Sequence, residues 1–307
     1  QILQSQGYCV GVWMESEKGI PSIDYLNNFN VIAWSTGNYW NTVIDENDAA
    51  LLGQLNRNIL FEGSDIAFDH NADAIMQNKL YAIFDRDILL DANLTKLVLR
   101  QHEILEGIAS IDLNEQLAPY PDSITPITTA MAIADWNNAG TAISAYDPVE
   151  TFSNPLTNGW NLASMPLKFE NTDSRSVYFT FSIDAVKDPG TKNKLMVNSI
   201  EWLDLNLLEN KKTENAFASI DGNYRAVLGY DSNAGLWKLY DPYRPMFLND
   251  LFEVNETMGL WVNSDGNNNW LINGMNPTNS LIRMRQGWNL VGYPLLERKP
   301  IAEALQN

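Results

Sequence analysis

The sequence predicts two domains: an α/β domain with a three-layer parallel sheet, and a C-terminal all-β, sandwich-like domain. Three observations indicate this. A strand–helix–strand pattern occupies residues 30–63, an amphipathic helical pattern occupies residues 191–208, and short apolar runs separated by turn sequences follow residue 209. The length of 307 residues also suits two domains of ordinary size.

The first pattern begins with "NVIAWST" at 30–36, a short apolar and β-branched run that is typical of a buried strand. Residues 45–57 then place Leu52 and Leu55 at helical spacing, and acidic residues occupy the first turn, where the helix dipole favours them. The apolar run at 58–63 predicts a second strand. A strand–helix–strand unit with short joints implies parallel strands that are covered by helices.

The second pattern follows later in the chain. Residues 175–186 alternate aromatic and small side chains and predict a strand, and residues 191–208 predict a helix. The apolar stripe of this helix is formed by Leu195, Ile200, Trp202 and Leu203. Because amphipathic helices normally bury such a stripe, we interpret it as core and not as a cofactor site.

The composition of the sequence changes at residues 209–215, "ENKKTEN", a segment that is rich in charged residues and poor in apolar ones. We therefore expect two domains, residues 1–209 and residues 210–307. Beyond the linker, turn sequences such as Asp221-Gly222 and Asn273-Gly274 recur between short apolar runs. This spacing is typical of an all-β unit.

The composition excludes several functions. The net charge is -18, with 20 Lys and Arg against 38 Asp and Glu, which argues against nucleic-acid partners and anionic membranes. The single Cys9 permits no intrachain disulfide, and His70 and His102 are too few and too far apart for a histidine-rich metal site. No apolar run is long enough to span a membrane, and we expect no cofactor.

Two features favour export. The chain begins at Gln1, without an initiator Met, which is typical of a processed chain or of a recombinant fragment. Asn93 and Asn255 lie in glycosylation sequons. We therefore expect a secreted or cell-surface protein, with Asn93 and Asn255 as candidate glycosylation sites.

The first 208 residues resemble the class I glutamine amidotransferase-like domains that occur as accessory parts of secreted prokaryotic proteins. The resemblance rests on "VIAWSTGNYW", "LFEGSDIAFD", "YPDSITP" and "VYFTFSIDAV", taken in this order. It implies a flavodoxin-like sheet. Working members of this class carry a nucleophilic Cys on the turn after a strand, and here the matching turn, "FEGSDIA", carries Ser64 instead.

Ser64 has two interpretations. With a base such as His70 nearby it would serve as the nucleophile of a hydrolase. Alternatively, Ser64 and Asp65 cap the helical turn that follows. We favour the second interpretation and predict that the domain is not an enzyme.

Several carboxylates are weak candidates for a hard cation. Asp85, Asp87 and Asp91 lie close together in "FDRDILLD", and Asp265 lies in the Asn-rich segment "NSDGNNNW". We interpret the first group as a solvated edge and the second as a turn, since Asp-Gly is a common turn sequence. No metal site is therefore predicted.

Residues 217–307 resemble a β-rich repeat module of archaeal and bacterial surface proteins. The matching motifs are "SIDGNYRAVLGYD", "WKLYDPYRPMFLNDL", "GLWVN" and "GWNLVGYPLLERKPIAEAL". The aromatic residues of this region would form either a sugar-stacking platform or an ordinary core, and we favour the core. The candidates for the platform are Trp237, Tyr240, Trp261 and Trp270.

The sequence "GWNL" occurs twice, at residues 159–162 and 287–290. We interpret the first copy as part of a hairpin in the first domain; alternatively, it opens the second module, with residues 173–208 intervening. The last copy either closes its own module or is donated to a neighbouring molecule. Its candidate interface residues are Trp288, Leu290 and Tyr293.

These observations predict a non-catalytic, self-associating structural component of a cell envelope, such as a subunit of a surface layer, sheath or filament. Its partners would be copies of itself joined through the C-terminal strand, and a cell-surface glycan is a second candidate. One alternative function is carbohydrate or surface binding as the accessory part of a secreted enzyme. The other is a serine hydrolase that uses Ser64.

Overall fold

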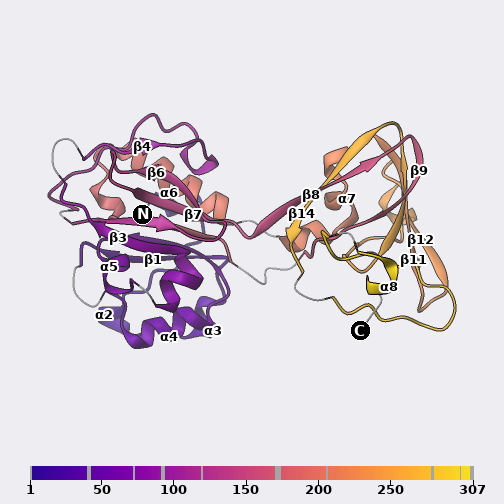
Figure 1. The fold of residues 1–307 in the computed structure, drawn as a ribbon, viewed down its shortest axis with the longest axis horizontal. Coiled ribbons are helices and arrows are strands. Elements are labelled where there is room, and N and C mark those ends of the chain that lie inside the picture. Colours follow the sequence, from indigo (N-terminus) through magenta and orange to yellow (C-terminus); the bar gives the residue numbers. More distant parts are fainter. Residues whose placement is uncertain are drawn as a thin grey trace. The chain divides into compact units, whose positions relative to one another are not determined.

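The structure is a computed structural model, and contacts between residues divide it into two compact units. The first unit contains Gln1–Pro148 and Asp173–Leu205, and the second contains Val149–Thr172 and Asn206–Asn307 (Figure 1). The described residues are 2–39, 43–71, 73–90, 94–118, 120–169, 174–204, 207–277, 280–297 and 299–304.

The first unit is built around one mixed sheet with the strand order β1-β2-β10-β7-β5-β3. Strands β1, β2 and β10 are parallel neighbours, and β10, β7, β5 and β3 continue as antiparallel neighbours. Strand β6 also pairs with β7, and β4 pairs with β6. The strands are β1 (Val31–Gly37), β2 (Asn58–Gly63), β3 (Ala82–Asp87), β4 (Val98–Leu99), β5 (Asp122–Pro126), β6 (Met131–Asp135), β7 (Thr141–Tyr146) and β10 (Ser176–Phe179).

Helices α4 (Glu46–Gln54) and α6 (Pro189–Leu203) are the long helices of the described residues. Asp45 starts α4 with a capping box, and Asp188 caps α6 directly before Pro189. Shorter helical turns are α1 (Ile2–Ser5), α2 (Glu15–Lys18), α3 (Ile23–Leu26), α5 (Ile66–Asp69), α7 (Thr213–Ala216), α8 (Ile301–Ala304), and the η turns Met76–Leu80, Glu103–Leu105, Ile183–Ala185, Leu207–Lys211, Ala218–Ile220 and Met246–Leu248.

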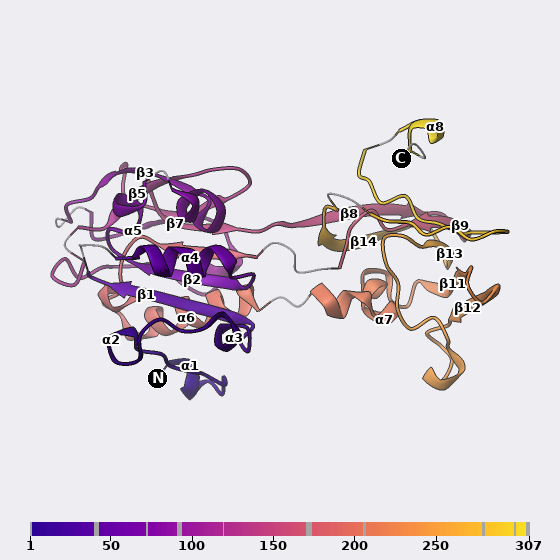
Figure 2. The ribbon, with the colours of Figure 1, turned by 90° about the horizontal axis from the view of Figure 1, so that it is seen from below.

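Alternate residues of the central strands enter two different apolar cores, because side chains of a strand point to opposite faces. Leu60 of β2 packs in the core that includes α6, and the neighbouring Phe61 packs in the core that includes α4 (Figure 2). The predicted stripe of the later helix is confirmed: its four residues are buried in the first of these cores.

The predicted fold class is wrong. The strand–helix–strand unit of β1, α4 and β2 is present, but five of the seven described strand pairings in the sheet are antiparallel, so the domain is not a parallel three-layer α/β sheet. The physical reason is the type of connection. Residues 136–140 form a tight turn between β6 and β7, in which Asn138 and Gly140 have φ angles of 58° and 91°, and such a turn returns the chain antiparallel.

A second connection also produces antiparallel pairing. After β7 the chain enters the second unit at Val149 and returns before β10, so that Tyr146 and Ser176 become direct partners. Residues 149–172 are therefore inserted between two strands of one antiparallel pair. The expected division into 1–209 and 210–307 placed this segment in the first domain, whereas its contacts lie in the second unit.

The second unit consists of two antiparallel sheets around one core. The four-stranded sheet has the order β12-β11-β13-β9, and β14 pairs with β8 in the other. Trp270 and Phe217 stack in the core, and the Trp270 indole nitrogen donates to the Ala216 carbonyl at 2.6 Å. The strands are β8 (Val149–Leu156), β9 (Gly159–Ser164), β11 (Tyr224–Asp231), β12 (Leu236–Tyr240), β13 (Gly259–Ser264) and β14 (Asn268–Met275).

The first "GWNL" copy belongs to this second unit. It forms β9, which pairs with β13 over its full length. The interpretation as a first-domain hairpin is wrong, and the alternative, a strand of the second module separated from it by an intervening segment, is confirmed.

None of the helices in the described ranges combines the length and the apolar character that crossing a membrane requires.

Candidate functional site

Three aspartates meet where strands of the first unit begin and end. Asp65 follows β2, Asp87 is the last residue of β3, and Asp122 is the first residue of β5. Asp87 and Asp122 are direct partners in the β3–β5 register. Each of the three carboxyl groups offers an oxygen that lies within 4.8 Å of the others, and we call this group the carboxylate cluster.

Asp122 is fully buried, and only one of its two carboxylate oxygens has hydrogen-bond partners among the described residues. Its Oδ2 accepts hydrogen bonds from the backbone N–H groups of Ala67 at 2.8 Å and Phe68 at 3.3 Å, and lies 3.4 Å from the Tyr178 hydroxyl. Its Oδ1 is inaccessible to solvent and has no hydrogen-bond partner among the described residues. Asp65 is buried and Asp87 is exposed, so the cluster reaches solvent on the Asp87 side.

The surroundings of the cluster favour protonation. Burial, with a smaller contribution from the neighbouring Asp65 and Asp87 carboxylates, raises the pKa of Asp122 to about 7, against the opposing effect of the backbone N–H groups. Burial, followed by the charges of Asp87 and Asp69, raises the pKa of Asp65 to about 6. These directions follow from three acids crowded into one partly buried place.

The predicted roles of Ser64 are not realised. Ser64 is 2% exposed and its Oγ has no hydrogen-bond partner within the described part of the chain. The His70 ring contacts the Asp73 carboxylate through Nδ1, and neither its Nε2 nor the Ser64 Oγ has a hydrogen-bond partner among the described residues, so His70 and Ser64 are not hydrogen-bonded to each other. The capping interpretation also fails, because Asp65 precedes α5 without a side-chain cap and with a positive φ of 61°.

The other candidate metal ligands separate into different surroundings. Asp87 joins the carboxylate cluster, whereas Asp85 accepts a hydrogen bond from Ser123 and pairs with Arg86. Asp91 lies outside the described residues. Asp265 pairs with Arg225 in the segment that joins β13 to β14, in agreement with its interpretation as a turn.

Sequence reasoning missed Asp65 and Asp122 as possible ligands. Asp122 begins the motif "DSITP", which reads as an ordinary strand start. The signal that would have revealed it is the pairing of β3 with β5, which sets Asp87 opposite Asp122. Like charges directly opposite in a sheet are unfavourable, so such a register is a marker of a special site.

The four-stranded sheet of the second unit carries a second feature, an apolar outer face. Cross-strand partners place Leu162 beside Trp261, Trp261 beside Leu228, and Tyr230 beside Trp237, while the intervening residues point into the core. Trp160 is 50% exposed, Leu162 62% and Trp237 52%. We define the aromatic face as Trp160, Leu162, Leu228, Tyr230, Trp237, Leu239 and Trp261.

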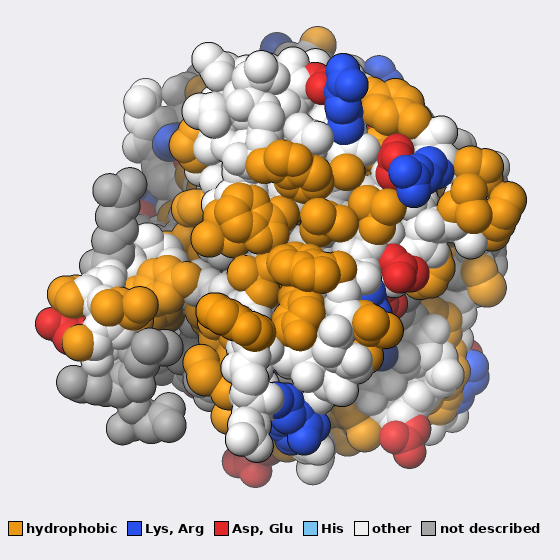
Figure 3. All heavy atoms as spheres, turned by 90° about the vertical axis from the view of Figure 1, so that its right-hand side faces the viewer, with side chains coloured by type: hydrophobic (Ala, Val, Ile, Leu, Met, Phe, Trp, Pro, Cys, Tyr) orange, Lys and Arg blue, Asp and Glu red, His pale blue; other side chains and the backbone are white. Residues whose placement is uncertain are grey.

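The aromatic candidates divide between this face and the core. Trp237 and Trp261 lie on the aromatic face, whereas Tyr240 and Trp270 are buried. Figure 3 shows the view onto the second unit, in which apolar side chains gather in the centre and charged side chains lie at the border. Trp160 was not a candidate, because its segment was assigned to the first domain.

The last "GWNL" copy contacts its own unit. Val291 forms an isolated bridge with Met258, and Gly292 donates to the Thr257 carbonyl at 2.8 Å. Of the candidate interface residues, Trp288 is 88% exposed, while Leu290 and Tyr293 are half-buried. Asn255, a candidate glycosylation site, is exposed, and Asn93 lies outside the described residues.

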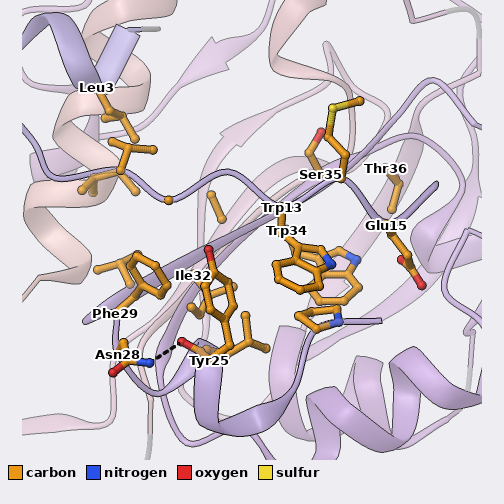
Figure 4. A pocket seen from close by; sticks show the side chains of 18 of the residues that line it. Leu3, Trp13, Glu15, Tyr25, Asn28, Phe29, Ile32, Trp34, Ser35 and Thr36 are labelled. Carbon is orange, nitrogen blue, oxygen red and sulfur yellow. Dashed lines mark hydrogen bonds between the residues drawn. The ribbon is translucent and has the colours of Figure 1, made fainter. Parts of the chain in front are cut away.

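A cavity of about 1200 Å³ lies along the edge strand β1 in the first unit. Its walls are rich in aromatic rings, among them Trp13, Tyr25, Phe29 and Trp34 (Figure 4). Glu15 also lines it, and burial together with the charge of Asp48 raises the pKa of Glu15. This lining suits an apolar or aromatic group, but no residue arrangement in it specifies a reaction.

Comparison with known proteins adds little. No family model and no curated protein matches the chain. The solved Cytoplasmic Protein STM3548 from Salmonella typhimurium has 13% identity and a TM-score of 0.43, over 66% of this chain and 84% of that one. Cytoplasmic Protein STM1381 from Salmonella typhimurium LT2 has 10% identity and a TM-score of 0.37, over 62% of this chain and 76% of that one.

Neither similarity carries an argument about function, because both TM-scores are below 0.5. Both proteins are named as cytoplasmic, which conflicts with the expected secreted or cell-surface location. We do not carry that expectation, or the surface-layer role that depended on it, into the proposed function. The resemblances to amidotransferase-like domains and to the surface-protein module stay predictions.

Proposed function

We propose that the chain works by binding and not by catalysis, and that the aromatic face joins it to a second copy of itself. The single observation that carries this proposal is the apolar character of both faces of the four-stranded sheet. The inner face buries Val227, Leu260 and Val262 in the core, and the outer face presents the aromatic face.

Antiparallel sheets with one solvated face normally alternate apolar and polar residues. Here β9 and β11 place apolar side chains at outward positions where polar ones are expected, including Trp160, Leu162 and Tyr230. Exposed apolar patches of this kind mark interaction sites, and Trp and Tyr are enriched among the residues that dominate binding energy. The sheet is therefore suited to bury its outer face against a partner.

The distribution of charge favours a second copy as that partner. The whole chain carries a net charge of -18, so two copies repel one another over most of their surface. The aromatic face contains no ionisable group except the Tyr230 hydroxyl, so two copies can meet there without like-charge contact. A two-fold dimer requires one patch that can pair with its own copy, and an uncharged apolar face suits this role.

Analytical ultracentrifugation of the whole chain tests the proposal. We expect a dimer at micromolar concentration, and Leu162→Glu is expected to yield a monomer with an unchanged circular dichroism spectrum, because it places two charges in the contact. Leu271→Glu is the matched control, since Leu271 is 45% exposed but lies on β14, outside the aromatic face.

A wild-type chain that stays monomeric, or a Leu162→Glu variant that still dimerises, contradicts the proposal. A monomer that binds insoluble polysaccharide, and loses this binding in Trp237→Ala, would instead support the carbohydrate-binding alternative. Serine hydrolysis receives no support from the buried Ser64, whose hydroxyl has no hydrogen-bond partner among the described residues.

A further inference from the structure

The carboxylate cluster carries an inference that is independent of the proposed dimer, because it lies in the other unit. We propose that Asp65, Asp87 and Asp122 form a binding site for one hard divalent cation of the class of Mg²⁺, Mn²⁺ and Ca²⁺. One oxygen atom of each carboxylate would coordinate the cation, and the cation would neutralise most of the combined charge of the three groups.

The spacing of the three oxygens suits a single ion. Two oxygens bound to the same cation lie at most twice the metal–oxygen distance apart, which is roughly 4.2 Å for Mg²⁺ and roughly 4.6–5.2 Å for Ca²⁺. The oxygens of the cluster lie within 4.8 Å of one another. A modest adjustment of the exposed Asp87 side chain brings all three into coordination range.

The buried Oδ1 of Asp122 gives a second reason to expect a ligand, and this reason does not depend on the spacing. Two backbone N–H groups hold Oδ2 in place, which leaves Oδ1 buried without a partner in the described part of the structure. A buried carboxylate oxygen without a partner is costly, and such atoms are rare in folded proteins. A bound cation supplies the missing partner.

The chemistry of the cluster selects the class of cation. Carboxylate oxygens suit Mg²⁺, Mn²⁺ and Ca²⁺, whereas Zn²⁺ and Cu²⁺ favour imidazole and thiolate ligands, which the cluster lacks. Asp87 is exposed, so an ion can enter and leave from solvent without unfolding of the domain. The competing arrangement is a cluster that holds protons and no metal.

Calorimetric titration and thermal melting of the EDTA-treated whole chain separate these two states. We expect MgCl₂, MnCl₂ or CaCl₂ to bind saturably with one ion per chain and to raise the melting temperature, whereas KCl of equal ionic strength does not. Asp87→Asn should weaken the affinity by about tenfold or more, since it replaces a charged carboxylate ligand with a neutral amide. Asp85→Asn is the matched control on the same strand and should keep the wild-type affinity.

The melting temperature gives a second readout, because Asp87→Asn should have opposite effects on it without metal and with metal. Without metal, Asp87→Asn should melt above the wild type, because it removes one of three mutually repelling charges. At the same metal concentration, the wild type and Asp85→Asn should gain more stability than Asp87→Asn, because they bind the ion more tightly. The absence of saturable binding for all three ions overturns the proposal and leaves the protonated cluster. Equal affinities for Asp87→Asn and Asp85→Asn overturn it as well.

Discussion

Strand β2 of the first unit ends in a buried carboxyl group, Glu62, and a conformationally restricted glycine, Gly63. Glu62 of β2 is buried, and it accepts a hydrogen bond from the Ile183 backbone N–H at 2.7 Å and another from the Ser35 hydroxyl. Burial raises the pKa of Glu62 in spite of these hydrogen bonds. The neighbouring Gly63 has a φ of 148° and lies against Thr36, so its conformation and its size are both restricted.

Glu62 makes stability depend on pH. Because its folded-state pKa lies above the ordinary 4.5, the folded state binds the proton more tightly, and its contribution to stability is lost as the pH rises from 4.5 through the folded pKa. Glu62→Gln removes this titration while it keeps an acceptor for Ile183 and a donor for Ser35. We therefore expect the melting temperature of the variant, relative to the wild type, to increase between pH 4 and pH 7. A constant difference across this range would contradict the assignment.

Two glycines should respond to alanine with opposite signs. At Gly63 an added Cβ would lie 1.9 Å from the Thr36 Oγ1, so Gly63→Ala should lower the free energy of unfolding by about 2–4 kcal/mol. Gly53 lies within α4 and an added Cβ meets nothing within 4 Å, so Gly53→Ala should raise it by about 0.5–1 kcal/mol. Urea denaturation of both variants measures the difference. A harmless Gly63→Ala would show that the Thr36 side chain turns away from position 63 at little cost.

At the scale of elements, the two "GWNL" copies have the same local structure and different pairing. In each copy an Asn side chain bonds the backbone N–H and C=O four residues earlier: Asn161 at Thr157, and Asn289 at Arg285. Gly159 and Gly287 both have positive φ angles, of 94° and 105°. The first copy then forms a full strand, whereas only an isolated bridge, at Val291, directly follows the second copy.

The difference in pairing should appear in stability. Asn161→Ala removes the side-chain hydrogen bonds to Thr157, Gly159 and Val262 that set the start of β9, and should cost about 1–3 kcal/mol in the free energy of unfolding of the second unit. Asn289→Ala removes similar hydrogen bonds before a weakly paired segment and should cost less than about 0.5 kcal/mol. Equal losses in chemical denaturation would show that the last segment is as firmly integrated as β9.

At the scale of the whole molecule, the chain passes between the two units at residues 148/149, 172/173 and 205/206. The second unit takes β8 and β9 from the segment that precedes β10, and its remaining strands from the C-terminal part of the chain. Its core therefore needs two separate stretches of sequence.

A fragment of residues 206–307 should not fold cooperatively, because it lacks β8, the partner of β14, and β9, one of the two partners of β13. Addition of a peptide of residues 149–172 should restore the β-sheet signal and a cooperative melting transition. Circular dichroism and proton NMR of the fragment with and without the peptide provide the measurement, with a scrambled peptide as the control. Cooperative folding of the fragment alone would show that β8 and β9 are dispensable.

The sequence by itself determined the local elements. The helices α4 and α6 follow from apolar periodicity and capping residues, and the parallel pair β1 and β2 follows from the short strand–helix–strand pattern. These features depend on residues that are neighbours in the chain, so propensity and periodicity are enough to predict them.

Only the tertiary structure decided the sheet order, the division of the units and the carboxylate cluster. The pairing of Tyr146 with Ser176 joins strands that are separated by an excursion into the other unit, and no local pattern reports such a return. Asp65, Asp87 and Asp122 come from three separate segments and meet only because β3 pairs with β5 and α5 packs against both. Long-range pairing depends on which surfaces bury one another, and that information is distributed over the whole chain.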